Sequence, residues 1–168
     1  MTEQVEQGYL LKGLTAAMLS VMPTRLHRQV DSWMENVGLR LTPKHMGLGL
    51  ELGKMEYDAV FSIEEFPFKE VNPMVVIATM MAWVMDNDPD RETFELGEPS
   101  YSVEPESDNT VTIEVSVPFI ETITVVEDDK GEITFRGKTY SLQPYEVWVA
   151  DKIWLHSGND VTLIESEK

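Results

Sequence analysis

The chain has 168 residues, no cysteine and a formal net charge of −17. Its length fits one domain, and a hydrophobic content of 42% with four Trp predicts a folded core. The missing cysteines exclude disulfides and thiolate metal sites, and the acidity argues against binding nucleic acid through its phosphates. We expect neither a signal peptide nor a membrane partner, because the chain has no basic leader and no apolar run of about 20 residues.

The charge is unevenly distributed along the chain. Residues 1–54 contain six Lys/Arg and five Asp/Glu, whereas residues 55–168 contain seven and twenty-five. An acidic surface can simply keep a protein soluble. A second interpretation is that the acidic part faces something that it must not bind, while the balanced part docks on a partner.

The first expected element is a helix over residues 8–21. Its apolar residues fall on one helical face, and Pro23 ends it. Residues 26–41 are ambiguous. Their first half spaces apolar residues as a helix does, whereas residues 38–41 alternate as a strand does.

A strand is expected over residues 48–63, with one irregularity. Residues 48–52 place leucine at every second position, and the alternation resumes with opposite parity in residues 55–63. Because side chains of a strand alternate between its two faces, this flip at Gly53 requires either a β-bulge or a two-residue hairpin turn.

A second helix is expected over residues 72–86. Asn72 is a good N-cap, and Pro73 suits the first helical position. Of the twelve residues 74–85, only Thr79 is not apolar. Twelve residues are too few to span a membrane, so we expect this helix to be buried in its own core or under a neighbouring subunit.

Strands dominate the remainder of the chain. Residues 101–103 and 111–117 alternate as strands around a turn at 107–109, Pro118 is expected to distort the ladder or lie at an edge, and short strand-like runs follow. This order predicts an α+β fold, with an antiparallel or mixed sheet of about four main strands flanked by two helices over residues 1–127. Residues 128–168 form a C-terminal extension of short strands, and we expect at least one of them to add to a sheet edge of its own or a neighbouring subunit.

No motif indicates an enzyme, a cofactor or a metal site. Asp86-x-Asp88-x-Asp90 resembles the opening of a calcium loop, but Arg91 and Gly97 occupy the positions where that loop requires Gly and Glu. The three histidines are scattered, and no glycine-rich loop for phosphates is present.

Three stretches, taken together, resemble a known family. They are MEYDAVFSIEEF (55–66), NPMVVIATMMAWVMDNDPD (72–90) and SDNTVTIEVSVPFIETITV (107–125). They give an aromatic-containing strand that ends in an acidic turn, a proline-led apolar helix containing Ala82-Trp83, and a strand that runs through Pro118 and Phe119. Over residues 8–127 the chain resembles the phage tail completion protein R family of contractile-tailed temperate phages.

The resemblance implies a structural virion protein, with neither enzymatic activity nor a cofactor. Such proteins cap the head-proximal end of the tail tube, and related tail terminators form six-fold rings. The implied partners are therefore further copies of the chain in a hexamer, the tail tube protein, and sheath or neck/connector proteins. DNA would pass through the lumen of the ring without sequence-specific contact.

On this interpretation one side of the second helix meets a neighbouring subunit, and cations of the N-terminal third meet acidic neighbours. The candidate interface residues are Met80, Met81, Trp83, Val84, Met85, Arg25, Arg28, Arg40, Lys44, Trp148 and Trp154. Two alternatives remain open. One is a small acidic DNA mimic that occupies the DNA site of a host enzyme, and the other is an adaptor for a single partner.

Overall fold

The computed structural model describes residues 8–47, 49–143, 152–157 and 160–165. Its helices are α1 (Tyr9–Ser20), the 3₁₀ helix η1 (Thr24–Gln29) and α2 (Pro73–Asn87). Its strands are β1 (Val30–His45), β2 (Leu50–Phe66), β3 (Ser100–Pro105), β4 (Val111–Glu127), β5 (Ile133–Phe135), β6 (Lys138–Leu142), β7 (Lys152–Ser157) and β8 (Asp160–Glu165).

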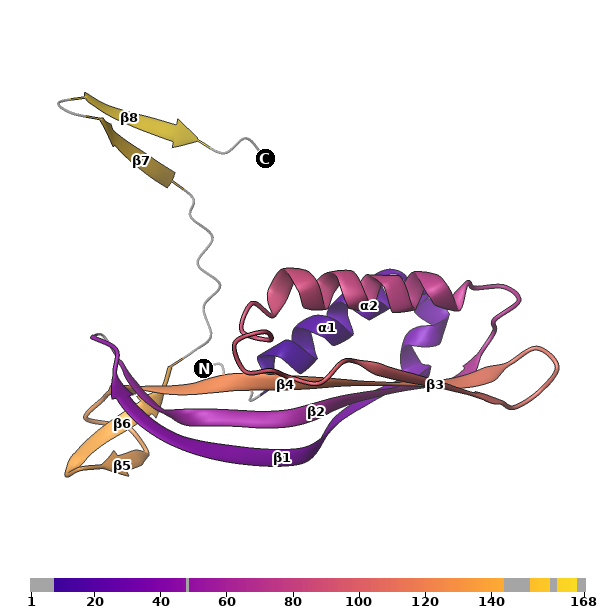
Figure 1. Cartoon of the computed structure of the whole chain (residues 1–168), viewed down its shortest axis with the longest axis horizontal. Coiled ribbons are helices and arrows are strands. Elements are labelled where there is room, and N and C mark those ends of the chain that lie inside the picture. Colours follow the sequence, from indigo (N-terminus) through magenta and orange to yellow (C-terminus); the bar gives the residue numbers. More distant parts are fainter. Residues whose placement is uncertain (1–7, 48, 144–151, 158–159, 166–168) are drawn as a thin grey trace.

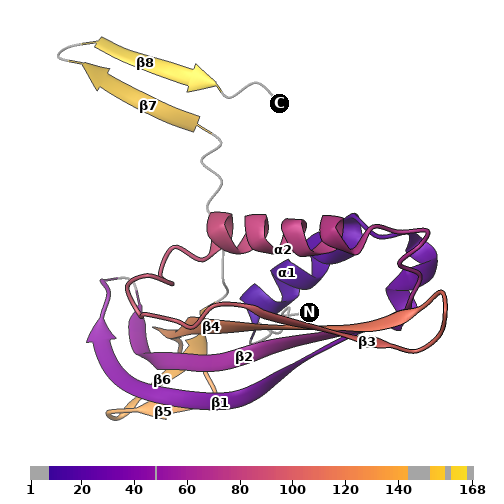
Figure 2. The ribbon, with the colours of Figure 1, turned by 45° about the vertical axis from the view of Figure 1, so that its right-hand side comes forward.

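Strands β1 to β6 form one antiparallel sheet, and β7 pairs with β8 in a second, two-stranded sheet. The order in the larger sheet is β1-β2-β4-β6-β5, and β3 pairs with the other half of β4. Helices α1 and α2 lie side by side over one face of the larger sheet, as Figure 1 and Figure 2 both show. The α+β class and the antiparallel pairing agree with the sequence-based expectation.

The sheet has six strands where the sequence predicted about four. One reason is β1, whose first half has apolar residues at helical spacing but pairs with β2 along its whole length. An extra β1 residue lies between Glu35 and Gly38, and Asn36 within this bulge adopts a positive φ of 51°. This bulge disturbs the period-two pattern that would have identified the strand.

The parity flip at Gly53 is a β-bulge and not a hairpin turn. β2 continues through it, with one extra residue between the pairs Glu51–Thr124 and Gly53–Ile123. A Cβ atom at position 53 would collide with the carbonyl oxygen of Arg40 on β1. The close approach of the two backbones therefore requires glycine at this position.

The predicted start of α2 is confirmed. The side chain of Asn72 accepts a hydrogen bond of 2.9 Å from the backbone N–H of Met74, and Pro73 occupies the first turn. The helix ends at Asn87. Local capping chemistry therefore fixes where this helix begins.

The C-terminal extension contributes to the main sheet. β6 pairs with β4 over 125–127 and with β5, so the expected addition of a short strand to a sheet edge is confirmed for β6. A small second core of Leu50, Val125 and Tyr140 lies at this end of the sheet. Of the short strand-like runs expected in the extension, the one at residues 146–149 lies outside the described residues. The runs at 153–155 and 161–164 fall within β7 and β8.

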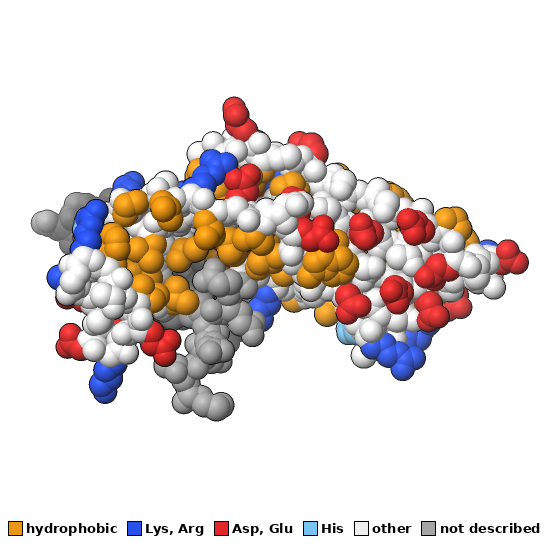
Figure 3. All heavy atoms as spheres, turned by 90° about the horizontal axis from the view of Figure 1, so that it is seen from below, with side chains coloured by type: hydrophobic (Ala, Val, Ile, Leu, Met, Phe, Trp, Pro, Cys, Tyr) orange, Lys and Arg blue, Asp and Glu red, His pale blue; other side chains and the backbone are white. Residues whose placement is uncertain are grey.

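The main core lies between the helices and the sheet. Its largest fully buried side chains come from α1, β2, α2 and β4, and they include Leu14, Met18, Tyr57, Phe61 and Phe119. Burying each of them contributes about 1.5–3 kcal/mol to stability. The opposite face of the sheet, seen in Figure 3, carries acidic side chains gathered toward the end where β3 and β4 meet and hydrophobic side chains over the other half.

Candidate interaction surfaces

Helix α2 is apolar on both of its long sides. The inner side packs into the core through Val76, Ile77, Met80 and Val84. The outer side leaves Met74, Val75, Met81 and Met85 exposed, with Met81 at 52% and Met85 at 73%. The nearly continuous apolar sequence of this helix therefore serves a core on one side and forms an apolar surface on the other.

Trp83 lies between α1 and the sheet. Its ring packs against Gly13 of α1 and meets the ring of Phe119 edge to face, with centroids 6.4 Å apart. It is half-buried, and Met80 and Val84 are buried. Of the five candidate interface residues on this helix, the structure thus exposes Met81 and Met85.

A groove of about 350 Å³ lies beside the C-terminal end of α2. We call it the α2 groove. Its apolar floor includes Met81, Val84 and Met85, and the exposed carboxylates of its rim are Glu92, Glu95 and Glu98. The groove thus combines apolar surface with negative charge.

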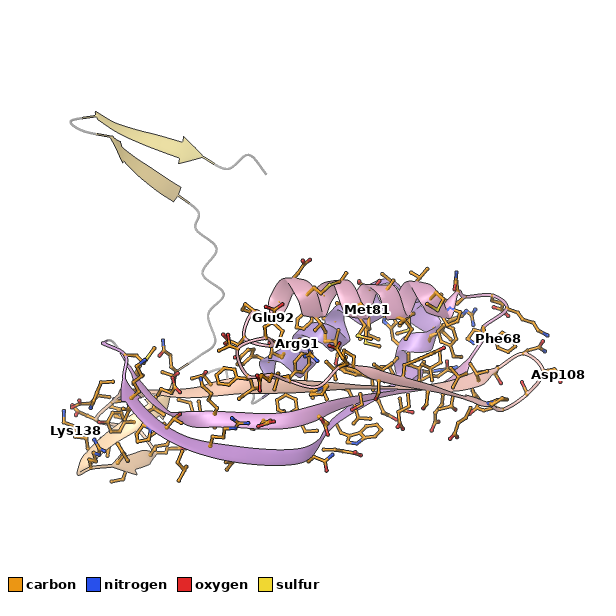
Figure 4. All side chains as sticks on the ribbon, viewed as in Figure 1. Phe68, Met81, Arg91, Glu92, Asp108 and Lys138 are labelled. Carbon is orange, nitrogen blue, oxygen red and sulfur yellow. The ribbon has the colours of Figure 1, made fainter. Side chains whose placement is uncertain are left out.

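Arg91 holds the loop that forms one wall of the α2 groove. Its Nη1 donates to Oδ2 of Asp88 at 3.2 Å and to the carbonyl oxygen of Pro118 at 2.9 Å, and its Nη2 donates to the carbonyl oxygen of Gly97. Pro118 lies on β4 between the stretches that pair with β3 and β6, so Arg91 bonds a carbonyl that the ladder leaves free on that side. Figure 4 shows Arg91 and Glu92 near the C-terminal end of α2.

Asp88 is the buried partner of this arginine. Its side chain is 2% exposed. Burial raises the pKa of Asp88 above its ordinary value, and the hydrogen bond and positive charge of Arg91 oppose that rise. The Asp86-x-Asp88-x-Asp90 sequence thus places its middle carboxylate in a structural ion pair.

The second apolar surface lies on strand β1, at the edge of the sheet. Residues 37–44 of this strand, here the β1 segment, pair with β2 on one side. Leu39 is 67% exposed and Leu41 is 87% exposed. Two cations accompany them: Arg40, which bonds Glu56 at 2.6 Å, and the exposed Lys44.

The four predicted interface cations do not form one patch. Arg25 and Arg28 lie on η1, before β1, and Arg25 bonds Glu70 at 2.6 Å. Arg40 and Lys44 lie in the second half of β1. Trp148 lies outside the described residues, and Trp154 falls within β7, of which the structure describes the backbone.

A buried polar cluster joins α1 to the sheet. Glu121 accepts hydrogen bonds from the backbone N–H groups of Gly8 at 3.0 Å and Leu10 at 2.9 Å, and from the hydroxyl of Tyr57 at 2.6 Å. Burial, together with the adjacent carboxylate, raises the pKa of Tyr57. These bonds are all internal to the fold.

Within the described residues, no group of three or more His, Asp or Glu could hold a metal ion.

Sequence reasoning did not identify the β1 segment as an apolar surface or the glutamate rim of the α2 groove. The alternation of residues 37, 39 and 41 was a usable signal, since it indicates a strand with leucines on one side. Alternation does not reveal whether that side is covered. The glutamate rim could not be predicted from the sequence, because its position depends on how the loop after α2 folds back on β4.

Comparison with known proteins finds a matching family and a similar phage protein. The model of the family described as P2 phage tail completion protein R (GpR) matches residues 8–144. A protein of Haemophilus phage HP1 (strain HP1c1), described as an uncharacterized 19.2 kDa protein in the rep-hol intergenic region, is 33% identical over 149 residues. That alignment covers 86% of this chain and 87% of the relative. The family match extends past residue 127, where the resemblance drawn from the sequence ended.

No solved structure matches the chain. Among the described residues, no helix is both long and apolar enough to cross a membrane.

Proposed function

The chain belongs to the P2 phage tail completion protein R family, and from this premise we propose that it closes the head-proximal end of the tail tube as a six-fold ring. Membership of the family makes it a structural protein of the phage tail, located in the virion. The ring, its position and its neighbours are the proposed part.

The observation that carries the proposal is the pair of separate apolar surfaces on one small chain. The outer side of α2 exposes Met81 and Met85, and the β1 segment exposes Leu39 and Leu41. Exposed apolar patches of this kind mark interaction sites. A ring subunit needs two different surfaces of this type, one for each neighbour, because its contacts are heterologous and must close.

The distribution of charge supports a DNA path beside the acidic end of the sheet. The exposed carboxylates at that end are Glu64, Glu65, Glu104, Glu106, Asp108 and Glu114. A negative surface repels DNA phosphates, the reverse of the attraction by which basic proteins hold DNA. A ring that presents this end to its lumen would let the genome pass without binding it.

The two rims of the ring would meet different proteins. We propose that one rim contacts the tail tube protein and that the other contacts sheath or neck/connector proteins. Arg25 and Arg28, on η1 near the acidic end, are candidates for contacts with acidic neighbours. No catalytic activity is part of the proposal.

The proposal is tested in a phage that carries this gene. Deletion of the gene is expected to give separate heads and tails by electron microscopy, and added purified protein is expected to restore their joining. Mass photometry of the purified protein, alone and bound to tails, is expected to give hexamers. Complete, joined tails in the absence of the gene would overturn the proposal.

The same experiment separates the proposal from a DNA mimic. A mimic predicts normal tails without the gene and a loss of progeny confined to hosts with the targeted DNA-binding enzyme. A tail protein predicts the same loss of progeny on every host.

A further inference from the structure

We propose that the β1 segment of one copy docks into the α2 groove of the next copy, with Leu39 and Leu41 on the apolar floor and Lys44 against the glutamate rim. This inference rests on the proposed ring and specifies which two surfaces meet in it.

The lining of the α2 groove is complementary to an occupant that is apolar and positively charged. Its floor includes the side chains of Met81 and Met85, and methionine adapts to the shape of a partner. Its rim carries Glu92, Glu95 and Glu98, while the cation beside them, Arg91, already bonds Asp88, Pro118 and Gly97. An apolar occupant without cations would leave the rim carboxylates uncompensated.

The β1 segment has this chemistry. Leu39 and Leu41 are two positions apart on a strand, so they lie on the same side, about 7 Å from each other. Leu41 is the most exposed large hydrophobic residue among those described, at 87%. Within the described part of the chain, Lys44 is exposed and has no ion-pair partner. Two leucines and a cation therefore project from one short stretch.

The groove and the segment cannot meet within one chain. Register holds Leu39 opposite Met55 and Leu41 opposite Gly53, so β1 lies on one side of β2. β4, whose Pro118 carbonyl anchors the groove loop through Arg91, lies on the other side of β2. Moving β1 into its own groove would break the sheet, so the segment must come from a second copy.

Edge-to-edge pairing of the β1 strands of two copies is less favourable than docking of the β1 segment into the groove. A residue inserted between Glu35 and Gly38, a second between Leu41 and Lys44, and Pro43 all interrupt the edge. Bulges and proline are the devices by which proteins prevent edge-to-edge pairing. The exposed side chains of β1 thus remain available while its backbone edge is protected, which favours docking into a groove.

The first test uses cysteine pairs, for which the chain is suited because it contains no native cysteine. Double variants combine Met81→Cys or Met85→Cys with Leu39→Cys or Leu41→Cys. Under mild oxidation, at least one double variant is expected to give a ladder of covalent oligomers up to the full ring. Each single variant is expected to stay monomeric on denaturing gels. The same variants are oxidised in tails isolated from phage, so the test does not depend on ring formation in solution.

The second test uses two charged variants, Met81→Glu in the groove and Leu41→Glu in the segment. Both positions are at least half exposed, so each variant is expected to keep the far-UV circular dichroism of the wild type. Placing a charge in an apolar contact should lower the oligomeric fraction roughly tenfold or more for each variant alone. A 1:1 mixture should form dimers and no larger species, because one intact groove and one intact segment remain in each pair.

Three results would overturn the inference while leaving the ring in place. One is a wild-type ring in which no cysteine pair between groove and segment cross-links. Another is dimer formation by either charged variant alone, which indicates contacts between identical surfaces. A third is cross-linking of Met81→Cys to Leu163→Cys in place of Leu41→Cys, which assigns the groove to the C-terminal hairpin. Absence of any ring, in solution and in tails, would instead overturn the proposed function.

Discussion

Glu121 is a buried carboxylate that takes the place of an N-terminal cap for α1. The cap residue Gly8 has no side chain to bond the first amides of the helix. Glu121, from the middle of β4, accepts the N–H groups of Gly8 and Leu10. A carboxylate at this position also interacts favourably with the positive end of the helix dipole. One side chain thereby fixes the helix onto the sheet.

Replacing Glu121 with Gln should destabilise the fold by about 1–3 kcal/mol. The new amide group would present a donor where the carboxylate accepts three hydrogen bonds, so one buried donor would remain without a partner. Urea unfolding followed by circular dichroism measures the change. Glu114→Gln, at an exposed position on the same strand, is the matched control and should change stability by about 0.5 kcal/mol or less. Equal effects at the two positions would contradict this account.

The ionisation of Asp88 predicts a pH dependence of stability. Its pKa in the folded state lies above its ordinary value of 3.8, chiefly because of burial. The folded state therefore binds this proton more tightly than the unfolded state, so the contribution of Asp88 to stability increases as the pH falls from neutral toward 3.8. Asp88→Asn removes this titration while keeping an oxygen that can accept from Arg91.

The expected result is a difference between two unfolding curves. The free energy of unfolding of the wild type, relative to that of Asp88→Asn, should increase as the pH is lowered from 7 to 4. The comparison isolates Asp88 because all other carboxylates are present in both proteins. Urea midpoints at the two pH values measure this difference. A constant difference, or one that changes in the opposite direction, would show that burial does not dominate at this carboxylate.

The crossing of α1 and α2 depends on a glycine. Gly13 has no Cβ, and the ring of Trp83 occupies the space where one would lie, at 2.6 Å from its position. The same ring also meets Phe119 edge to face. Glycine within a helix is unfavourable by about 1 kcal/mol relative to alanine. Its presence at this position therefore reflects packing between the helices and not helix propensity.

Gly13→Ala should destabilise the protein although alanine favours the helix. Displacing the ring should cost about 1–3 kcal/mol, which exceeds the gain in propensity. In a background with Trp83→Leu the same substitution should become neutral or stabilising, because the obstacle is gone. Urea unfolding of the four variants of this double-mutant cycle measures the coupling. Destabilisation of the same size in both backgrounds would exclude Trp83 as the cause.

At the scale of elements, the sequence predicted what local chemistry determines. The Asn72 cap with Pro73 defined the start of α2, and the alternation in 111–117 defined β4. The first half of β1 was ambiguous because its pairing with β2 and its bulge, both distant interactions, decide its structure. Long-range pairing commonly overrides local propensity in strands.

At the scale of the whole molecule, the sequence indicated which residues share a face but not which faces are covered. Of the candidate interface residues on α2, Met81 and Met85 are exposed, whereas Met80 and Val84 are buried. Nor did the sequence indicate that Leu39 and Leu41 would be among the most exposed apolar residues. Exposure depends on how far the two helices extend over the sheet, and that is a property of the assembled fold.

The strand pairing indicates where the stably folded part of the chain ends. Residues 133–142 belong to the main sheet through β6, whereas β7 pairs with β8 and with no other strand that the structure describes. Tyr140 covers Leu50 and Val125, which are 3% and 0% exposed. An isolated two-stranded hairpin contributes little stability of its own. The fold should therefore tolerate a chain that ends after residue 143, but not one that ends after residue 127.

Two truncated chains, 1–143 and 1–127, test this boundary against each other. The longer one should unfold within about 0.5 kcal/mol of the full chain. The shorter one should lose about 3 kcal/mol or more, because exposing two buried aliphatic side chains costs about 1.5–3 kcal/mol each. Urea unfolding is followed by far-UV circular dichroism, because this signal does not depend on Trp148 and Trp154, which both truncated chains lack. A large loss in the 1–143 chain would mean that residues after 143 stabilise the main sheet, and an unchanged 1–127 chain would mean that β5 and β6 are dispensable to it.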